Sequence, residues 1–177
     1  MNQEKIDRNW LPNAGLTAKM KVLAIDDEPA NVALLEAMLL EGGYTRVKTI
    51  IDSRLAMEAC LGFDPDIILL DLMMPHVDGF TILESVRETA AETFLPVIVL
   101  TADANEGTKL RALRAGATDF LLKPFDQLEV LIRMNNLLET RRLHLQLDMQ
   151  RAAFEEAVRE RTSELREAQV QLRGVAR

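Results

Sequence analysis

Polar side chains capable of chemistry stand at the ends of four apolar runs in this sequence. Runs of consecutive apolar residues are typical of strands that are buried on both faces of a parallel sheet. Parallel strands end at one edge of their sheet, and open α/β sheets place their chemistry at that carboxyl edge. We therefore expect one site to bring together the groups at the ends of these runs: Asp26, Asp27, Asp71, Thr101 and Lys123.

Three close carboxylates limit what this site can do. They repel one another, and at neutral pH they require a cation or a proton. Mg²⁺ suits such a site because it binds a few carboxylates, a backbone carbonyl and retained waters. The only histidines are His76 and His144, which argues against a histidine-based metal site, and we expect His76 to be an exposed loop residue. An aspartate, Mg²⁺, a lysine and a hydroxyl are what phosphoryl transfer to an aspartate nucleophile requires.

Strands and helices alternate along the part of the chain that carries these groups. Pro29 fits the first turn of a helix, and Gly42 and Gly116 fit the ends of two helices. The five predicted strands span residues 21–25, 46–50, 67–70, 97–100 and 118–122. Five strand–helix units with short connections predict an α/β fold, a doubly wound parallel sheet with helices on both faces.

Composition excludes several classes of protein. The chain has 177 residues and is 48% hydrophobic, enough for one domain with a sizeable core and an extension. A net charge of −7 argues against a nucleic-acid surface. No apolar run approaches the roughly 20 residues that span a bilayer, so we expect no membrane segment. The single cysteine, Cys60, is expected to be a small core residue, and one cysteine favours a cytoplasmic protein. Residues 1–19 are expected to be a disordered or loosely ordered leader.

The last predicted helix is unusually long. Between Asp126 and Leu172 the sequence has no proline or glycine, a longer stretch than most globular helices. Two apolar stripes follow seven-residue spacing, with Arg161 interrupting the second and a phase shift between them near residues 147–152. We expect a parallel coiled-coil homodimer, and the alternative is a helix folded back on its own domain. The dimer contacts would come from Leu131, Leu138, Leu145, Phe154, Val158, Leu165 and Leu172.

The order of the motifs resembles that of a known family. The residues that carry the resemblance are Asp26-Asp27, Asp71 with Met74-Pro75 and Asp78-Gly79, Thr101-Ala102, and Lys123-Pro124. Together they resemble the receiver domain of two-component response regulators, the CheY-like superfamily, over about residues 21–138. The resemblance implies a flavodoxin-like sheet of order 2-1-3-4-5 within a receiver domain at residues 20–138. It implies a phosphorylation-dependent signalling role rather than an enzyme.

The resemblance also implies roles for the acidic residues. Asp71 would be the phosphoacceptor. Asp27 and Asp71, together with the backbone carbonyl of Met73, would hold Mg²⁺, and Asp26 would contribute through a water molecule. The phosphoryl group would come from a histidine on a cognate histidine kinase or phosphotransfer protein.

Three further residues match the family's switch and its bridge. Thr101 and Phe120 match the switch pair, in which the hydroxyl moves to the phosphate and the aromatic ring turns inward. Lys123 would bridge the phosphoryl group and an acidic residue, and the Lys123–Pro124 peptide is expected to be cis. The apolar Met73 and the acidic Asp103 should influence the access of the water that removes the phosphate.

Residues 139–177 are expected to form a coiled-coil signalling helix. Residues 158–169 are similar to the linkers that precede HD-GYP cyclic-di-GMP phosphodiesterases, and less distinctively to those before diguanylate cyclases or histidine kinases. We therefore expect an output domain that is absent from this sequence, which would be a truncated chain.

Two other functions remain open at this point. Phosphatases of the haloacid-dehalogenase class also use a strand-end aspartate with Mg²⁺, a hydroxyl and a lysine. That class places a second aspartate two residues after the nucleophile, where this chain has Met73. The other alternative is an unphosphorylated, receiver-like adaptor, against which the complete set of acids, Thr101 and Lys123 argues.

Overall fold

The computed structural model describes residues 13–103 and 105–175. The chain divides into two units, Met1–Arg141 and Arg142–Arg177. The first unit contains a parallel sheet and the helices that cover it, and the second is helical. The described residues contain no helix that is long and apolar enough to cross a membrane.

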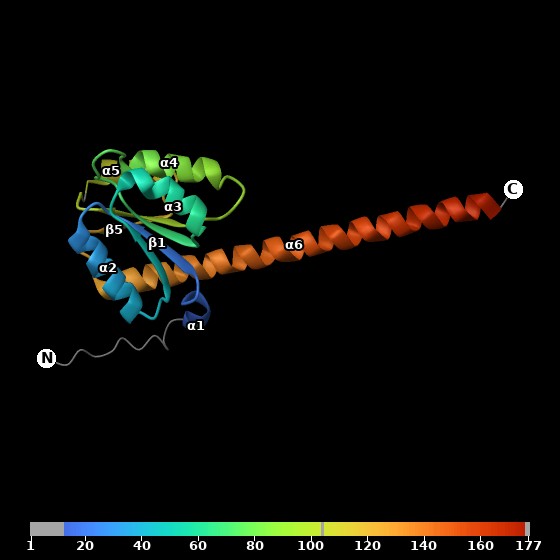
Figure 1. Ribbon diagram of the computed structural model, residues 1–177, viewed down its shortest axis with the longest axis horizontal. Helices are drawn as coiled ribbons and strands as arrows, with labels where there is room; N and C mark the ends of the chain where they lie inside the picture. Colours follow the sequence, from blue (N-terminus) through green and yellow to red (C-terminus); the bar gives the residue numbers. More distant parts are fainter. Residues whose placement is uncertain (1–12, 104, 176–177) are drawn as a thin grey trace. The chain divides into compact units, whose positions relative to one another are not determined.

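A five-stranded parallel sheet organises the first unit (Figure 1). Its order is β2-β1-β3-β4-β5, which confirms the predicted doubly wound topology. The strands are β1 (Lys21–Ile25), β2 (Arg46–Ile50), β3 (Ile67–Asp71), β4 (Val97–Thr101) and β5 (Asp119–Leu122). Strands β1, β3 and β4 are almost wholly buried, as their continuous apolar runs predict. Strands β3 and β4 each include the polar residue at their carboxyl end, Asp71 and Thr101.

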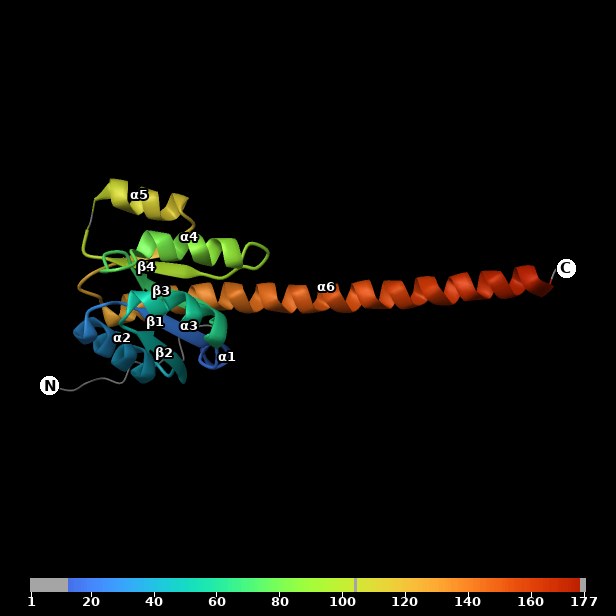
Figure 2. The same cartoon turned by 45° about the horizontal axis from the view of Figure 1, so that its top comes forward.

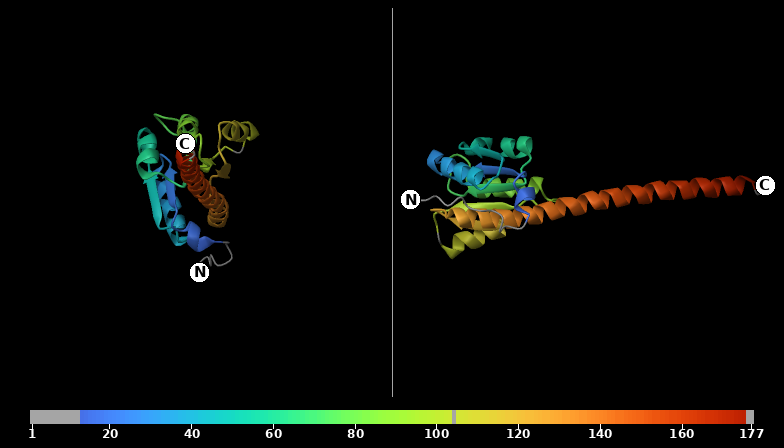
Figure 3. Two further views of the ribbon diagram at one scale, coloured as in Figure 1. Left: turned by 90° about the vertical axis from the view of Figure 1, so that its right-hand side faces the viewer. Right: turned by 90° about the horizontal axis from the view of Figure 1, so that it is seen from below.

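Helices cover both faces of this sheet. They are α2 (Pro29–Glu41), α3 (Ala56–Phe63), α4 (Gly79–Thr89), α5 (Glu106–Arg114) and the beginning of α6 (Gln127–Val175), with a short 3₁₀ helix η2 (Ser53–Leu55) before α3. Leu23 and Ile25 of β1 pack in one core with residues of α3, α4 and α5. Figures 2 and 3 show α3 and α4 side by side, with the start of α6 on the other side of the strands.

The residues just before β1 are ordered, which corrects one expectation. Residues 1–19 are predicted to be a loosely ordered leader, but α1 (Ala14–Thr17) is a short helix and Met20 is buried. The Thr17 hydroxyl donates to Asn135 Oδ1 on α6 at 2.9 Å, and both residues are buried. Since a buried hydroxyl requires a partner, this bond fixes α1 on α6. Residues 1–12 of the expected leader lie outside the described residues.

Two of the seven expected dimer contacts belong instead to the core of the first unit. Leu131 and Leu138 are both fully buried within the chain itself, as are their neighbours Val130 and Met134. The Leu131 side chain lies so close to Gly42, at the end of α2, that a side chain at position 42 would collide with it. The first apolar stripe therefore covers the sheet, and the prediction that these two leucines form a dimer contact is wrong.

The second unit presents its apolar side chains to solvent. The exposed fractions of Phe154, Val158, Leu165 and Leu172 are 70%, 48%, 57% and 72%, whereas Leu145 is partly buried. Ion pairs along the helix join neighbouring turns, as between Arg151 Nε and Glu155 Oε1 at 2.9 Å. Such exposed ion pairs contribute little to the stability of the helix. Burial of the exposed apolar stripe would therefore be the larger source of stability for this unit.

Candidate functional site

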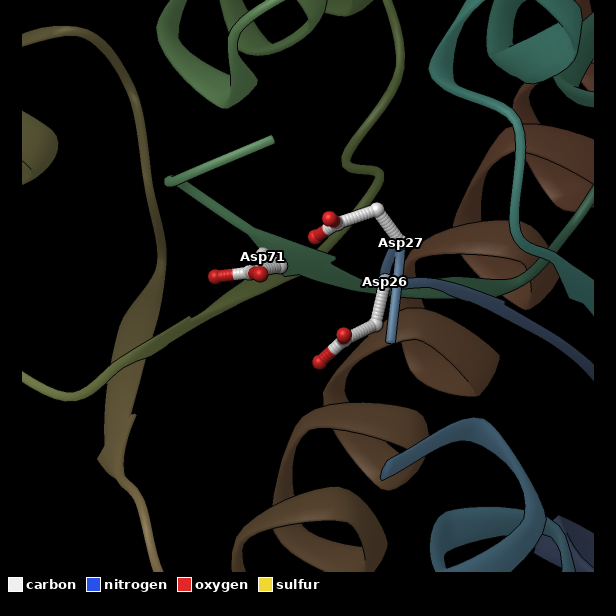
Figure 4. Close-up of side chains that lie close together, drawn as sticks. All are labelled: Asp26, Asp27 and Asp71. Atoms are coloured by element: carbon white, nitrogen blue, oxygen red, sulfur yellow. The ribbon is translucent and has the colours of Figure 1, made fainter. Parts of the chain in front are cut away.

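Three carboxylates meet at the carboxyl edge of the sheet, as predicted. Asp26 and Asp27 directly follow β1, and Asp71 is the last residue of β3, the neighbouring strand. Each offers an oxygen within 4.8 Å of the others. Figure 4 shows the side chains leaving the two strands toward the same side. The site exists because adjacent parallel strands bring together residues that are 45 positions apart in the sequence.

Asp26 is fully buried and fully engaged by donors. Its Oδ1 accepts from the Glu28 backbone N–H at 2.9 Å. The Asn31 amide donates to both of its oxygens, at 3.3 and 3.2 Å, and Lys123 Nζ lies 2.6 Å from Oδ2. A buried carboxylate needs such partners because it has lost its hydration. Asp26 is therefore held in place by these donors and in turn positions Lys123.

Lys123 is shared between two aspartates. Its Nζ lies 3.1 Å from Asp71 Oδ2 as well as 2.6 Å from Asp26. Burial lowers the pKa of Lys123, but the hydrogen bonds that its ammonium donates to Asp26 and Asp71 outweigh burial and leave the pKa raised, so the ammonium stays charged. Lys123 follows β5, its backbone N–H donates to the Thr101 carbonyl at 2.9 Å, and the Lys123–Pro124 peptide is cis, as expected.

Asp71 combines burial with access to the site. Only 4% of its surface is exposed. Burial raises its pKa, an effect that the hydrogen bond and the charge of Lys123 only partly offset and that the charge of Asp26 reinforces. The Met73 backbone N–H donates to Asp71 Oδ1 at 3.3 Å, whereas the Met73 side chain is 74% exposed. At neutral pH the carboxylate is less stabilised by its surroundings than an ordinary aspartate, which suits a nucleophile.

Hydrogen bonds and close backbone packing hold the loop after Asp71. The Ser53 hydroxyl donates to the Pro75 carbonyl at 2.6 Å and accepts from the Val77 N–H at 3.1 Å. Gly79 lies directly against the backbone of Asp71, where any side chain would strike the Asp71 carbonyl. Asp78 then caps α4 by accepting from the Thr81 N–H at 2.8 Å. The Asp-Gly pair therefore allows α4 to start close to Asp71.

The two expected switch residues lie on β4 and β5. Thr101 is buried, and its hydroxyl accepts from the Asp103 N–H at 3.0 Å. Phe120 is partly buried against the core, with Lys109 Nζ 4.7 Å from its ring centroid. Asp103 in turn accepts from the Thr108 hydroxyl at 2.7 Å, which lowers the pKa of its carboxyl.

A cavity of about 740 Å³ opens over these residues. Its walls combine the acids and Lys123 with Asn31, Phe80, Thr101 and Arg111. The cavity gives Asp71 an open side through which an anion of phosphate size can approach.

The residues of this site fit a Mg²⁺ ion. The cluster offers hard oxygen ligands within reach of one another, which is what Mg²⁺ prefers. Asp27 and Asp71 suit direct ligation, together with the Met73 carbonyl two residues after Asp71. Asp26 has both oxygens committed to protein donors, so a contribution through water, as expected, fits it better.

Two other sequence expectations concern residues near this edge. His76 is exposed and adopts a positive φ of 70° in the loop after Asp71, which fits a turn residue. Cys60 is partly buried against the core, and burial raises the pKa of its thiol to about 11, so it is a packing residue.

Sequence reasoning missed two residues that shape the site. Asn31 donates to Asp26 from the first turn of α2, and Ser53 fixes the loop after Asp71 from η2. Both are common residue types at helix starts, where they are expected to act as caps. Their targets lie in other elements, so only the folded arrangement identifies them.

Comparisons with known proteins agree with this geometry. The family model described as "Response regulator receiver domain" matches residues 22–135. Response regulator PleD of Caulobacter vibrioides is 39% identical over 117 residues, covering 66% of this chain and 26% of PleD. The chain thus spans about a quarter of the length of that relative.

Solved structures show the same fold. The receiver domain of a sensor histidine kinase of Pseudomonas aeruginosa, with a magnesium ion coordinated in its active-site cleft, is 30% identical with a TM-score of 0.61. The match covers 68% of this chain and 98% of that one. A protein described as a two-component system response regulator/GGDEF domain protein has a TM-score of 0.68 and 26% identity, covering 73% of this chain and 53% of that one.

Proposed function

Because this chain belongs to the family of response regulator receiver domains, we propose that Asp71 is the residue on which it accepts a phosphoryl group. Receiver domains are phosphorylation-dependent signalling domains of two-component systems that bind Mg²⁺ at an acidic pocket. The observation that carries the proposal is the placement of Asp71. It is a strand-end carboxylate with a raised pKa, paired with Lys123 and open to a cavity.

The proposed reaction moves one phosphoryl group. An oxygen of the Asp71 carboxylate attacks phosphorus and forms a new P–O bond. The P–N bond to a donor histidine breaks, and the imidazole nitrogen keeps the electron pair. With acetyl phosphate, the P–O bond to acetate breaks instead and acetate leaves. Lys123 stays charged throughout and is 3.1 Å from Asp71, where it can neutralise an incoming phosphate oxygen.

Asp27, Asp71 and the Met73 carbonyl would hold the ion in this reaction, with Asp26 acting through water. When bound, Mg²⁺ supplies the positive charge that lets an anion approach three carboxylates. Thr101 would then donate its hydroxyl to the phosphate, and Phe120 would turn inward. The present hydrogen bond from Asp103 N–H to the Thr101 oxygen leaves the hydroxyl proton available for that role.

Signal output is proposed to pass through the second unit. The apolar side chains of Phe154, Val158, Leu165 and Leu172 recur at coiled-coil spacing and are exposed in a single chain, and Leu145 precedes them across the phase shift. A parallel homodimer would bury them and would carry a change at Asp71 to an output domain. The proposed partners are a histidine kinase or phosphotransfer protein as donor and a second copy of the chain. We propose no enzymatic role for this chain itself.

The test of the phosphoacceptor follows the intact mass of the protein. The chain is incubated with Mg²⁺ and acetyl phosphate, and we expect one labile phosphate adduct. Asp71→Asn should abolish the adduct, and EDTA should suppress it. Asp64→Asn is a matched control because Asp64 is exposed at the opposite end of the sheet and its positive φ of 51° suits asparagine.

Other outcomes would contradict the proposal. An adduct that persists in Asp71→Asn at full yield places the acceptor elsewhere. Continuous turnover of many phosphoesters indicates a haloacid-dehalogenase-like phosphatase. The absence of any adduct in the wild-type chain indicates an adaptor.

A further inference from the structure

A second cation lines the cavity above Asp71. Arg111 extends from α5, and its guanidinium carbon lies 3.7 Å from the centroid of the Phe80 ring, in the first turn of α4. Both residues line the cavity that contains Asp71 and Lys123. A guanidinium stacked on an aromatic face is attracted by the ring's quadrupole, which restricts an otherwise flexible side chain. Phe80 therefore holds a positive charge at the cavity wall.

The two cations of this cavity differ in how they are engaged. Lys123 is bonded to Asp26 and Asp71 and has its charge largely offset. Among the residues that the structure describes, no carboxylate forms an ion pair with Arg111 within 4.0 Å. The positive charge of Arg111 therefore acts on neighbouring carboxylates only through longer-range electrostatic attraction. The pKa of Asp78 is lowered chiefly by the Thr81 N–H and additionally by the charge of Arg111.

Most other charged groups that line the cavity near Arg111 are negative. The same cavity wall carries Asp27, Glu28, Asp71 and Asp103, so an approaching phosphate would meet mainly negative groups. The single charge of Lys123 is shared between two carboxylates that are already present, Asp26 and Asp71. An additional, uncommitted cation at the wall shifts the balance in favour of a donor with more negative charge.

We propose that Arg111, seated on Phe80, is a donor-selecting residue that attracts the phosphate of the incoming phosphodonor and favours dianionic donors over monoanionic ones. This inference rests on the proposed function of Asp71. It assigns to α5 a role in the speed and selectivity of phosphorylation. Arg111 takes no part in bond making, which Asp71 performs.

The test compares two small donors of different charge. Near neutral pH acetyl phosphate is a dianion, whereas phosphoramidate is mainly a monoanion. With the full chain and saturating Mg²⁺, the second-order rate of adduct formation is measured by quenched mass spectrometry. Each donor is used at ionic strengths of about 0.02 M and about 0.5 M, where the screening length changes several-fold.

Three variants separate charge from structure. Arg111→Gln removes the charge, Arg111→Lys keeps the charge but loses the planar stacking group, and Arg114→Gln removes an exposed charge from the same helix that does not line the cavity. We expect Arg111→Gln to slow acetyl phosphate by roughly three- to fivefold at low salt, an estimate for one partly screened charge acting on a dianion. The loss should be smaller for phosphoramidate and should nearly vanish at high salt. Arg111→Lys should retain most of the rate, and Arg114→Gln should match wild type.

Each contrary result has a distinct meaning. An Arg111→Gln rate equal to wild type with both donors overturns the role of Arg111 while leaving Asp71 as the acceptor. An equal loss with both donors at both salt concentrations indicates a structural defect and also overturns the inference. A wild-type chain that forms no adduct overturns the proposed function and the inference together.

Discussion

The two parts of helix α6 share one sequence pattern and have opposite surroundings. In the part that belongs to the first unit, Leu131 and Leu138 are fully buried, seven residues apart. In the second unit, Val158 and Leu165 are also seven residues apart, yet both are about half exposed. The comparison teaches that apolar periodicity identifies the face of a helix that requires a cover, but not what covers it.

The packing of this part of α6 against the rest of the first unit also explains why it carries buried polar residues. Asn135 lies within the buried surface because Thr17 of α1 supplies its hydrogen bond. Arg141 is nearly buried, and its Nη1 donates to the Phe94 carbonyl at 2.8 Å. No coiled-coil seam would need these partners. In the second unit, Arg161 interrupts the apolar stripe. It forms an ion pair with Glu164 on its own helix at 2.7 Å, and both side chains stay exposed to solvent.

The largest expected effect tests the buried part. Leu138→Ala should lower the free energy of unfolding of the first unit by about 3 kcal/mol, because it removes fully buried methyl groups and leaves a cavity. Leu165→Ala, the same change at a 57% exposed position, should leave that unfolding transition within about 0.5 kcal/mol of wild type. Urea denaturation followed by circular dichroism measures both. Equal losses of unfolding free energy for the two variants would contradict the assignment of Leu138, but not Leu165, to the core of the first unit.

The next effect tests whether a second copy covers the exposed stripe. We expect the intact chain to be a dimer by light scattering at concentrations of about 10–50 μM, in the range of ordinary affinities. The double variant Phe154→Ser, Leu165→Ser should raise the dissociation constant at least about tenfold, since each change removes apolar surface from both helices of the pair. Arg166→Ser, a change beside the stripe, is the control. A monomeric wild-type chain would contradict the coiled-coil proposal.

A smaller effect concerns the polar contact that fixes α1 on α6. Thr17→Ala should destabilise the first unit by about 1–2 kcal/mol because it removes the buried hydrogen bond between the Thr17 hydroxyl and Asn135 Oδ1. Asn136→Ala, an exposed neighbour on the same helix, should have little effect. Thermal unfolding of both variants checks this difference. If the two losses are the same, α1 does not contribute to the cover of α6.

The smallest expected effect is a pH-dependent change in the thermal stability of the first unit, caused by the titration of Asp71. The pKa of Asp71 is raised by burial, so the folded state holds its proton at a pH at which the unfolded chain has released it. Stability therefore falls as pH rises from the ordinary pKa of an aspartate through the folded value, and the charged group is a cost at neutral pH. Without Mg²⁺, Asp71→Asn should raise the midpoint of thermal unfolding by a few degrees at neutral pH.

That gain should shrink as the pH is lowered below the ordinary pKa of an aspartate, where both states are protonated. Asp148→Asn, at an exposed position of the second unit, should change the midpoint at neither pH. A lower midpoint for Asp71→Asn at neutral pH would show that the pairing with Lys123 outweighs burial.

The fold and the meeting of the three carboxylates both follow from the order of residues along the chain. Continuous apolar runs separated by helical periods permit few arrangements other than a doubly wound parallel sheet, and strand ends in such a sheet share one edge. Strand order and direction alone are therefore enough to place Asp26, Asp27 and Asp71 together at that edge.

The pairing of side chains, by contrast, is visible only in the folded chain. The hydrogen bond of Ser53 to Pro75 and the stacking of Arg111 on Phe80 join elements that are distant in the sequence, and no local pattern encodes them. The Asn31–Asp26 hydrogen bond spans only five residues, but it depends on how α2 starts after β1. The burial of Leu131 and Leu138 is a similar case, since their spacing suits a sheet face as well as a coiled coil. The physical reason is common to all of them: side-chain spacing fixes direction along one element, whereas burial and pairing depend on the surface that another element brings to it.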